Sequence, residues 1–130
     1  MTELGLRAVG RARPDTVWLR YAHCRRWPDW SPYLLRVRAD GDRIAPGTRG
    51  TVTSYLGVTA CFVVESVDER RRTWTWRVRL GPLRLWLAHA VLPHPRGTET
   101  RLTVRGPGPV PFLYAPLARL ALRRLVAPET

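Results

Sequence analysis

Apolar residues recur at helical spacings early in the chain and predict a first helix. Trp18 and Tyr21 would share one face of a helix that begins at Pro14. Proline suits the first turn of a helix, and Asp15 lies where a negative charge stabilises the positive end of the helix dipole. The residues before this helix, 4–12, suit a first strand.

After this helix the pattern breaks and then changes to a period of two, which is typical of half-buried antiparallel strands. Two prolines within residues 24–32 predict a short second helix or an irregular turn there. The clearest alternation runs over residues 73–80 and would place Trp74, Trp76 and Val78 on one face of a strand. Together with residues 4–12, the predicted strands are residues 35–39, 51–55, 58–67, 73–80, 83–92 and 98–105.

The segment 106–109, Gly-Pro-Gly-Pro, is the strongest break in the pattern, and residues 110–127 after it have the composition of a helix. On a helical wheel the apolar residues of this segment form one broad face, which we expect to point inward. That face contains Val110, Leu113, Tyr114, Leu117, Ala118, Leu120, Ala121 and Leu125.

The order of these elements predicts an α+β fold: one strand, one or two short helices, about six strands and a long final helix. A strongly curved antiparallel sheet must cover its inner face, and one long amphipathic helix can do so. We expect the sheet and this helix to splay apart at one end. They would then leave an apolar cavity with aromatic walls.

The composition fits a single domain over residues 1–130, and a hydrophobic share of 45% excludes a disordered chain. No run of about 18 apolar residues is present, so no membrane span is expected. The chain opens with Met1, Thr2 and Glu3, which do not resemble the start of a signal peptide. Two cysteines are too few for a disulfide framework, and we therefore expect free thiols and a cytoplasmic location.

Twenty-two basic and ten acidic residues give a net charge of +12, which would suit a polyanionic partner. All of these basic residues are arginines, however, and they are dispersed along the chain. Such a bias is typical of coding from GC-rich DNA, so a solvated basic surface is the simpler interpretation. An acidic partner such as an acyl carrier protein remains an alternative. No nucleic-acid partner is expected, since the chain has no helix-turn-helix, zinc-finger or RNA-binding sheet motif.

Several local motifs together resemble those of the START-like or Bet v 1-like (SRPBCC) superfamily, which includes bacterial polyketide cyclase/dehydrase domains. They are Pro-Asp-Thr-Val-Trp at 14–18, Trp-Pro-Asp-Trp-Ser-Pro-Tyr at 27–33, Trp-Thr-Trp at 74–76 and Gly-Thr-Glu-Thr-Arg-Leu-Thr at 97–103. The resemblance covers nearly the whole chain. It implies a helix-grip fold, in which a seven-stranded antiparallel sheet wraps around the C-terminal helix and encloses a hydrophobic pocket. It does not fix the function, because relatives include cyclases, dehydratases, lipid carriers and plain binders.

His89 is the first candidate for a catalytic residue. Strict alternation along residues 83–92 would turn Leu87, His89 and Val91 inward, and an imidazole there could exchange a proton near neutral pH. The competing interpretation is a structural histidine with hydrogen-bonded nitrogens. Tyr114, on the expected inward face of the last helix, is the second candidate, although its hydroxyl could equally bind a backbone group.

The residues expected to contact a substrate are mostly aromatic, and broad aromatic walls suit flat, apolar or polyene ligands. They are Trp30, Tyr55, Phe62, Trp74, Trp76, Leu87 and Leu117. No metal or nucleotide cofactor is expected, because the sequence lacks metal-ligand spacing, a Gly-x-Ser-x-Gly motif and a phosphate-binding glycine loop.

The leading functional hypothesis is a polyketide cyclase/dehydratase-like enzyme of bacterial natural-product metabolism that holds a reactive chain in shape. The alternative is a non-catalytic binding or carrier protein for a hydrophobic small molecule or lipid. A third hypothesis is an interaction module that docks an acidic protein or RNA. The chain could be a monomer or a homodimer, and His89 is the residue that separates the first hypothesis from the second.

Overall fold

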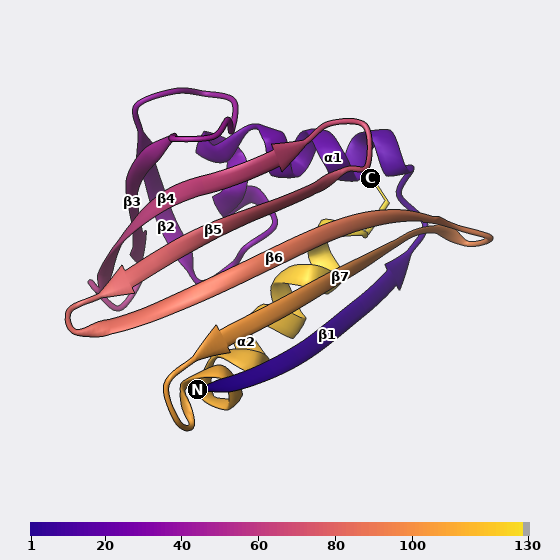
Figure 1. The fold of residues 1–130 in the computed structure, drawn as a ribbon. Coiled ribbons are helices and arrows are strands. Elements are labelled where there is room, and N and C mark those ends of the chain that lie inside the picture. The colour runs from indigo at the N-terminus through magenta and orange to yellow at the C-terminus, as the bar shows by residue number, and fades with distance from the viewer. Residues whose placement is uncertain (129–130) are drawn as a thin grey trace.

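The structure, a computed structural model, describes residues 1–128 and contains one seven-stranded sheet and three helical segments (Figure 1). In chain order the elements are β1 (Thr2–Gly10), α1 (Pro14–Ala22), the 3₁₀ helix η1 (Cys24–Asp29), β2 (Leu34–Ala39), β3 (Arg49–Ser54), β4 (Thr59–Asp68), β5 (Thr73–Leu80), β6 (Leu83–His94), β7 (Gly97–Gly106) and α2 (Val110–Leu125). The order and type of these elements agree closely with those predicted from the amino-acid sequence.

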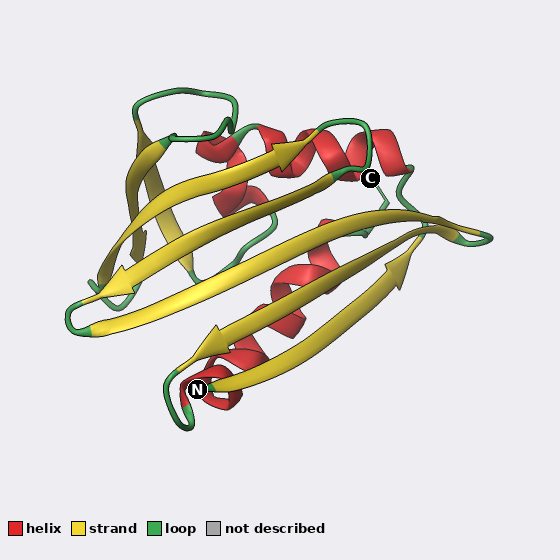
Figure 2. Cartoon of the chain, in the orientation of Figure 1, coloured by secondary structure: helices red, strands yellow, loops and turns green. Residues whose placement is uncertain are grey.

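The strands lie in the order β1-β7-β6-β5-β4-β3-β2, and each neighbouring pair is antiparallel. The sheet curls, and the long helix α2 lies along its inner face, as Figure 2 shows. This is the predicted helix-grip arrangement. The register places Trp74 of β5 opposite His89 of β6, and His89 opposite Leu102 of β7. The alternation within these strands turns all three side chains inward, where they are buried.

The C-terminal end of α2 is fixed against α1 and the end of β1. The guanidinium of Arg20 donates hydrogen bonds to the carbonyl oxygens of Leu125 (2.6 Å) and Ala127 (2.7 Å), which are acceptors left free by the end of the helix. A Cβ atom at position 10 would lie 2.2 Å from the carbonyl oxygen of Val126, so only glycine lets the two segments approach this closely.

The face of α2 that points inward agrees with the expected one at Ala118, Ala121 and Leu125 and differs from it elsewhere. The buried side chains are Pro111, Ala115, Ala118, Ala121, Leu122 and Leu125. Leu113, Leu117 and Leu120 point outward, with 72%, 44% and 43% of their surface exposed. The helical wheel weighted the leucines by hydrophobicity, whereas the helix packs against bulky aromatic side chains of the sheet and therefore turns its small alanines toward them.

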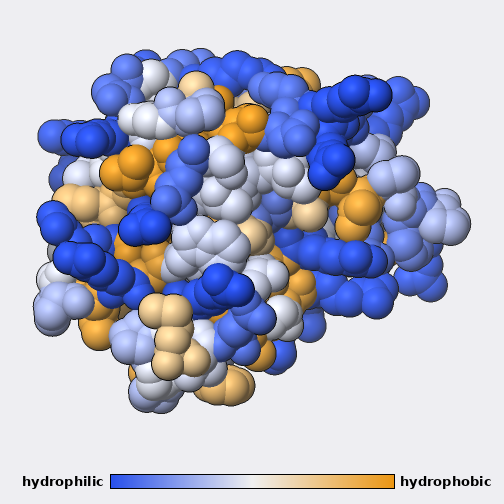
Figure 3. Space-filling view, viewed as in Figure 1, coloured by the Kyte–Doolittle hydropathy of each residue, from blue (hydrophilic) through white to orange (hydrophobic). Residues whose placement is uncertain are grey.

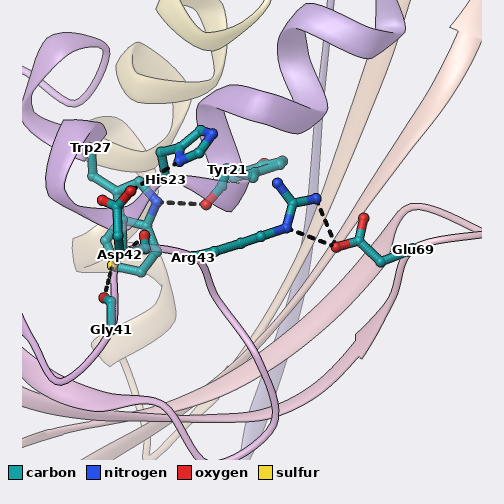
Figure 4. A network of polar contacts seen from close by, with 8 residues as sticks. Tyr21, His23, Trp27, Gly41, Asp42, Arg43 and Glu69 are labelled. Carbon is teal, nitrogen blue, oxygen red and sulfur yellow. Dashed lines mark hydrogen bonds and ion pairs between the residues drawn. The ribbon is translucent and has the colours of Figure 1, made fainter.

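The segment containing α1 and η1 is fastened to the connection between β2 and β3 (Figure 4). The amide of Cys24 donates to the carbonyl of Asp42 (3.1 Å), and the amide of Ile44 donates to the carbonyl of Ala22 (2.8 Å). The thiol of Cys24 also donates to the carbonyl oxygen of Gly41 (3.2 Å). These contacts hold α1 and η1 over the inner face of the sheet, where they supply buried aromatic residues. Within residues 1–128, neither α-helix combines the length and apolarity that a membrane span requires.

Candidate functional site

The space between α2 and the inner face of the sheet is almost completely filled. A cavity of about 30 Å³ remains there, which is room for one or two water molecules. Its walls come from the sheet, α2 and the segment that runs from η1 to β2: Trp27, Trp30, Ser31, Tyr33, Leu34, Trp74, Trp76, His89, Leu102, Tyr114, Ala118, Ala121 and Leu122. The expected aromatic walls are therefore confirmed, whereas side chains fill most of the space expected for a ligand.

Aromatic rings from three elements fill this interior. The ring centroid of Trp27 in η1 lies 5.6 Å from that of Trp74 and 5.0 Å from that of Trp76, both in β5. Phe62 of β4 lies 5.4 Å from Trp76. Offset and edge-to-face contacts at these separations are favourable for aromatic pairs. The rings thus occupy the volume that the curved sheet would otherwise leave open.

His89 is buried beside this cluster, and both of its ring nitrogens have hydrogen-bond partners. The indole N–H of Trp76 donates to Nε2 at 3.0 Å, so Nε2 must carry the lone pair. The proton therefore lies on Nδ1, which donates to the hydroxyl of Tyr21 at 3.1 Å. That hydroxyl then donates to Oγ1 of Thr100 at 3.0 Å. Burial lowers the pKa of His89 to about 3, and the ring is neutral at physiological pH.

This arrangement limits what His89 can do chemically. A neutral ring cannot give up a proton as an imidazolium does, and its lone pair stays occupied unless Trp76 moves away. The inward orientation expected from alternation is confirmed. A catalytic role for His89 stays a prediction.

Tyr114 of α2 meets Tyr33, which precedes β2, across one side of the cavity. Their hydroxyl oxygens lie 2.7 Å apart, so one hydroxyl donates a hydrogen bond to the other. Burial is the largest cause that raises the pKa of both hydroxyls above the usual value of tyrosine. Both groups therefore remain protonated at neutral pH and act as hydrogen-bonding groups there.

The residues expected to contact a substrate lie in three different places: in the cavity wall, elsewhere in the core and on the surface. Trp30, Trp74 and Trp76 line the cavity, as expected. Phe62 and Leu87 are buried in the core but are not among the residues that line the cavity.

Tyr55 and Leu117 were wrong as contact residues: 68% of Tyr55 and 44% of Leu117 is exposed. Tyr55 lies in the turn after β3, outside the sheet, and Leu117 lies on the outer face of α2.

Sequence reasoning missed how two small residues shape the site. Ala118 and Ala121 line the α2 side of the cavity together with Tyr114 and Leu122, and the small size of the alanines lets the helix approach the tryptophans closely. The recurrence of alanine at 115, 118 and 121, three residues apart, was the available signal. Its meaning depends on what the helix faces, which the spacing does not reveal.

A second and much larger hollow lies outside, between α1, η1 and the C-terminal end of α2. This outer groove has a volume of about 840 Å³ and is lined by Thr16, Leu19, Arg20, His23, Arg26, Asp29, Trp30, Arg124, Ala127 and Pro128. Trp30 lines both the groove and the interior cavity, so its ring forms part of the partition between them. Among the described residues no cluster of His, Cys, Asp or Glu has an arrangement that could hold a metal ion.

The basic residues are spread over the surface, as the sequence indicates. Hydrophilic side chains cover much of the outer side of the sheet, which faces the viewer in Figure 3, with small apolar patches between them. Several arginines there pair with carboxylates, for example Arg77 with Glu65 at 2.7 Å and Arg105 with Glu3 at 2.5 Å. The charge is therefore partly compensated locally.

A family model described as polyketide cyclase / dehydrase and lipid transport matches residues 6–129. Among curated proteins, no sequence match was found. Solved structures match the fold at low identity. A hypothetical protein from Helicobacter pylori superposes with a TM-score of 0.82 at 14% identity, covering 96% of this chain and 86% of that one. Ara h 8.0201 superposes with a TM-score of 0.76 at 12% identity, covering 95% of this chain and 94% of its own.

One further solved structure is a di-domain ARO/CYC protein, BexL, from the BE-7585A biosynthetic pathway. It superposes with a TM-score of 0.79 at 17% identity, and the match covers 97% of this chain but 45% of that one. Identities this low establish the fold alone.

Proposed function

We propose that this chain, which belongs to the polyketide cyclase/dehydrase and lipid transport family of the Bet v 1-like superfamily, binds a flat, uncharged apolar molecule between α2 and the tryptophans of the sheet. The observation that carries the proposal is the lining of the interior cavity. Four tryptophans, two tyrosines and the alanines of α2 meet there. Of the described residues that line it, none is an arginine, aspartate or glutamate.

Such a lining favours an aromatic or polycyclic guest, because flat rings can continue the stacking that the tryptophans already make with one another. A charged guest would lose its hydration without gaining a partner of opposite charge. The present volume of about 30 Å³ is too small for an organic molecule, so binding requires the interior to open.

We expect the cavity to open at the side where Tyr33 and Tyr114 meet. The C-terminal end of α2 is held by Arg20, whereas the middle of the helix meets the segment before β2 through the hydrogen bond between the two tyrosines. A bond of this kind contributes about 0.5–1.5 kcal/mol. Trp30 is only partly buried and can move toward the outer groove, which would add the volume of its ring to the cavity.

The test is a calorimetric titration with 1-tetralone, a flat ketone with two fused rings. We expect the wild-type protein to bind it and Ala118→Trp, which fills the cavity from α2, to lose binding. Leu117→Trp is the matched control, since it places the same ring on the outer face of the helix. Ala121→Leu is a milder blocking variant in case Ala118→Trp does not fold. Equal binding by both tryptophan variants, or no binding by the wild-type protein, would exclude an interior site.

A second candidate function is the cyclase/dehydratase activity expected from the sequence. It is favoured by the presence of His89, Tyr33 and Tyr114 around one cavity. A tyrosine hydroxyl would donate to a carbonyl of a bound poly-β-ketone, and Nε2 of His89 would accept a proton once Trp76 has moved. With a poly-β-ketone thioester as substrate, His89→Gln should abolish turnover and leave the affinity for this substrate within about tenfold of the wild-type value. An equal loss of both would assign His89 to packing.

An acidic carrier protein as partner stays a prediction. Its association with this chain of net charge +12 should weaken steeply as salt rises from low to physiological concentration. Association that does not respond to salt would exclude an electrostatic surface.

A further inference from the structure

Three buried tryptophans and the partly buried Trp30 have partners for their indole N–H groups, whereas one further buried tryptophan does not. Trp18 donates to Glu69 at 2.5 Å, and Trp27 donates to the carbonyl of Tyr21 at 2.9 Å. The other two acceptors are the carbonyl of Arg20 for Trp30, at 3.2 Å, and Nε2 of His89 for Trp76, at 3.0 Å.

Trp74 is the exception. It is 1% exposed, and within the described part of the chain its Nε1 is the buried side-chain nitrogen or oxygen without a hydrogen-bond partner. Buried polar groups in native proteins are nearly always paired, because an unpaired donor loses its bond to water and gains nothing. A donor left free inside a cluster of otherwise satisfied groups therefore calls for a partner that is not part of the chain.

The ring of Trp74 cannot easily turn to find a partner within the protein. It stacks on the ring of His89 at 4.4 Å with an interplanar angle of 10°. The ring centroids of Trp27 and Trp76 lie 5.6 and 5.3 Å away, and Tyr21 makes an edge-to-face contact at 5.4 Å. These contacts fix the orientation of the Trp74 ring and therefore the direction in which its N–H points.

Trp74 also lines the interior cavity, whose other polar side chains are largely committed. Both nitrogens of His89 are occupied, and the hydroxyls of Tyr33 and Tyr114 share one hydrogen bond. Trp74 therefore brings an unpaired donor to the apolar, uncharged surroundings of this cavity. A neutral carbonyl or ether oxygen suits such a donor, whereas a carboxylate would be buried without a counter-charge.

We propose that Trp74 is a specificity-determining residue, whose indole N–H donates to a carbonyl oxygen on the flat, uncharged ligand that the interior takes up. This inference rests on the proposed binding function and narrows its ligand class from apolar molecules in general to those that carry an acceptor oxygen. A ligand without that oxygen would leave the donor unpaired and bind more weakly.

The experiment compares 1-tetralone with tetralin, which has the same two rings and a methylene group in place of the carbonyl. Calorimetry on the wild-type protein should give about tenfold tighter binding of the ketone. Trp74→Phe keeps an aromatic ring and removes the N–H, so the preference should fall to within about twofold. Trp86→Phe is the matched control, because Trp86 lies on the other face of the sheet beside Arg105 and should keep the preference.

NMR of the wild-type protein provides a second readout, and variants are needed only to assign the signals. The six tryptophans give six indole N–H resonances, and that of Trp74 should move downfield with 1-tetralone and not with tetralin. If both compounds bind, both are blocked by Ala118→Trp and neither moves this resonance, the Trp74 proposal is overturned while the binding function stands. A contact from this N–H to a long-lived water that persists with 1-tetralone bound would also overturn it. Failure of both compounds to bind would remove the binding function and this inference together.

Discussion

The interior cavity and the outer groove lie on two sides of Trp30 and differ in size and chemistry. The cavity measures about 30 Å³ and is walled by aromatic rings and alanines, whereas the groove measures about 840 Å³ and contains Arg20, Arg26 and Arg124. Aromatic rings attract one another and close the space between them. Arginines need water around their charged ends, and they keep the groove open. The larger hollow is therefore not the better candidate for an apolar ligand.

The two hollows should also differ in how much their side chains contribute to stability. Substitutions in the cavity wall remove close contacts or leave buried polar groups unpaired, which are the changes that destabilise proteins most. Substitutions at exposed groove residues such as Arg26 exchange one solvated side chain for another. Four measurements of the free energy of unfolding test this difference.

The largest effect is expected for Trp27→Ala, because this ring lies at the centre of the aromatic cluster and is 2% exposed. Its loss should cost about 3–5 kcal/mol, measured by urea denaturation. Trp86→Ala on the outer face of the sheet, where the ring contacts Arg105, should cost about 1 kcal/mol. Similar losses for the two variants would mean that the interior is less closely filled than described.

The second-largest effect is the loss of stability at acidic pH. The folded protein holds the pKa of His89 at about 3, below its ordinary value of 6.5, so the unfolded state takes up a proton first as the pH falls. Stability should therefore be lost as the pH drops below 6.5, by up to about 1.4 kcal/mol per pH unit and about 2 kcal/mol in all by pH 5. His89→Gln, which cannot take up this proton, should have a flatter dependence over the same range.

Ring signals of His89 in NMR provide a direct check of the same point. They should remain those of the neutral form with the proton on Nδ1 down to pH 5. Protonation of the ring near pH 6.5 in the folded protein would contradict the enclosed arrangement.

Thr100→Val tests the polar end of the interior. The variant keeps the shape of the side chain but removes the acceptor of the Tyr21 hydroxyl, and should cost about 1 kcal/mol. Thr103→Val, on the outward face of the same strand, is the control and should change stability by less than about 0.5 kcal/mol. Equal losses would show that the hydrogen bond to Thr100 contributes nothing of its own.

The smallest effect is expected in the groove. Arg26 is exposed, and its replacement by serine should alter the free energy of unfolding by less than about 0.5 kcal/mol. A loss above about 1 kcal/mol would give this part of the groove a structural role and weaken the contrast with the cavity.

The strands could be predicted because their signal is local. Alternation over 73–80 matches β5 at both ends, and the same rule correctly turns His89 inward on β6. The inward face of α2 could not be predicted in this way, because leucines and alanines both suit an apolar face. The choice of Ala118 over Leu117 depends on the size of the rings opposite, which come from other elements.

The sequence alone determined the order and type of the elements, the curled antiparallel sheet around a final helix and the aromatic character of its inner face. These properties follow from periodicity and turn residues, which act over a few neighbouring positions. Only the tertiary structure decided that the rings close the interior, that Trp76 and Tyr21 occupy both nitrogens of His89 and that the N–H of Trp74 stays free. Volume and hydrogen-bond pairing depend on side chains brought together from distant parts of the chain, and no local pattern encodes that meeting.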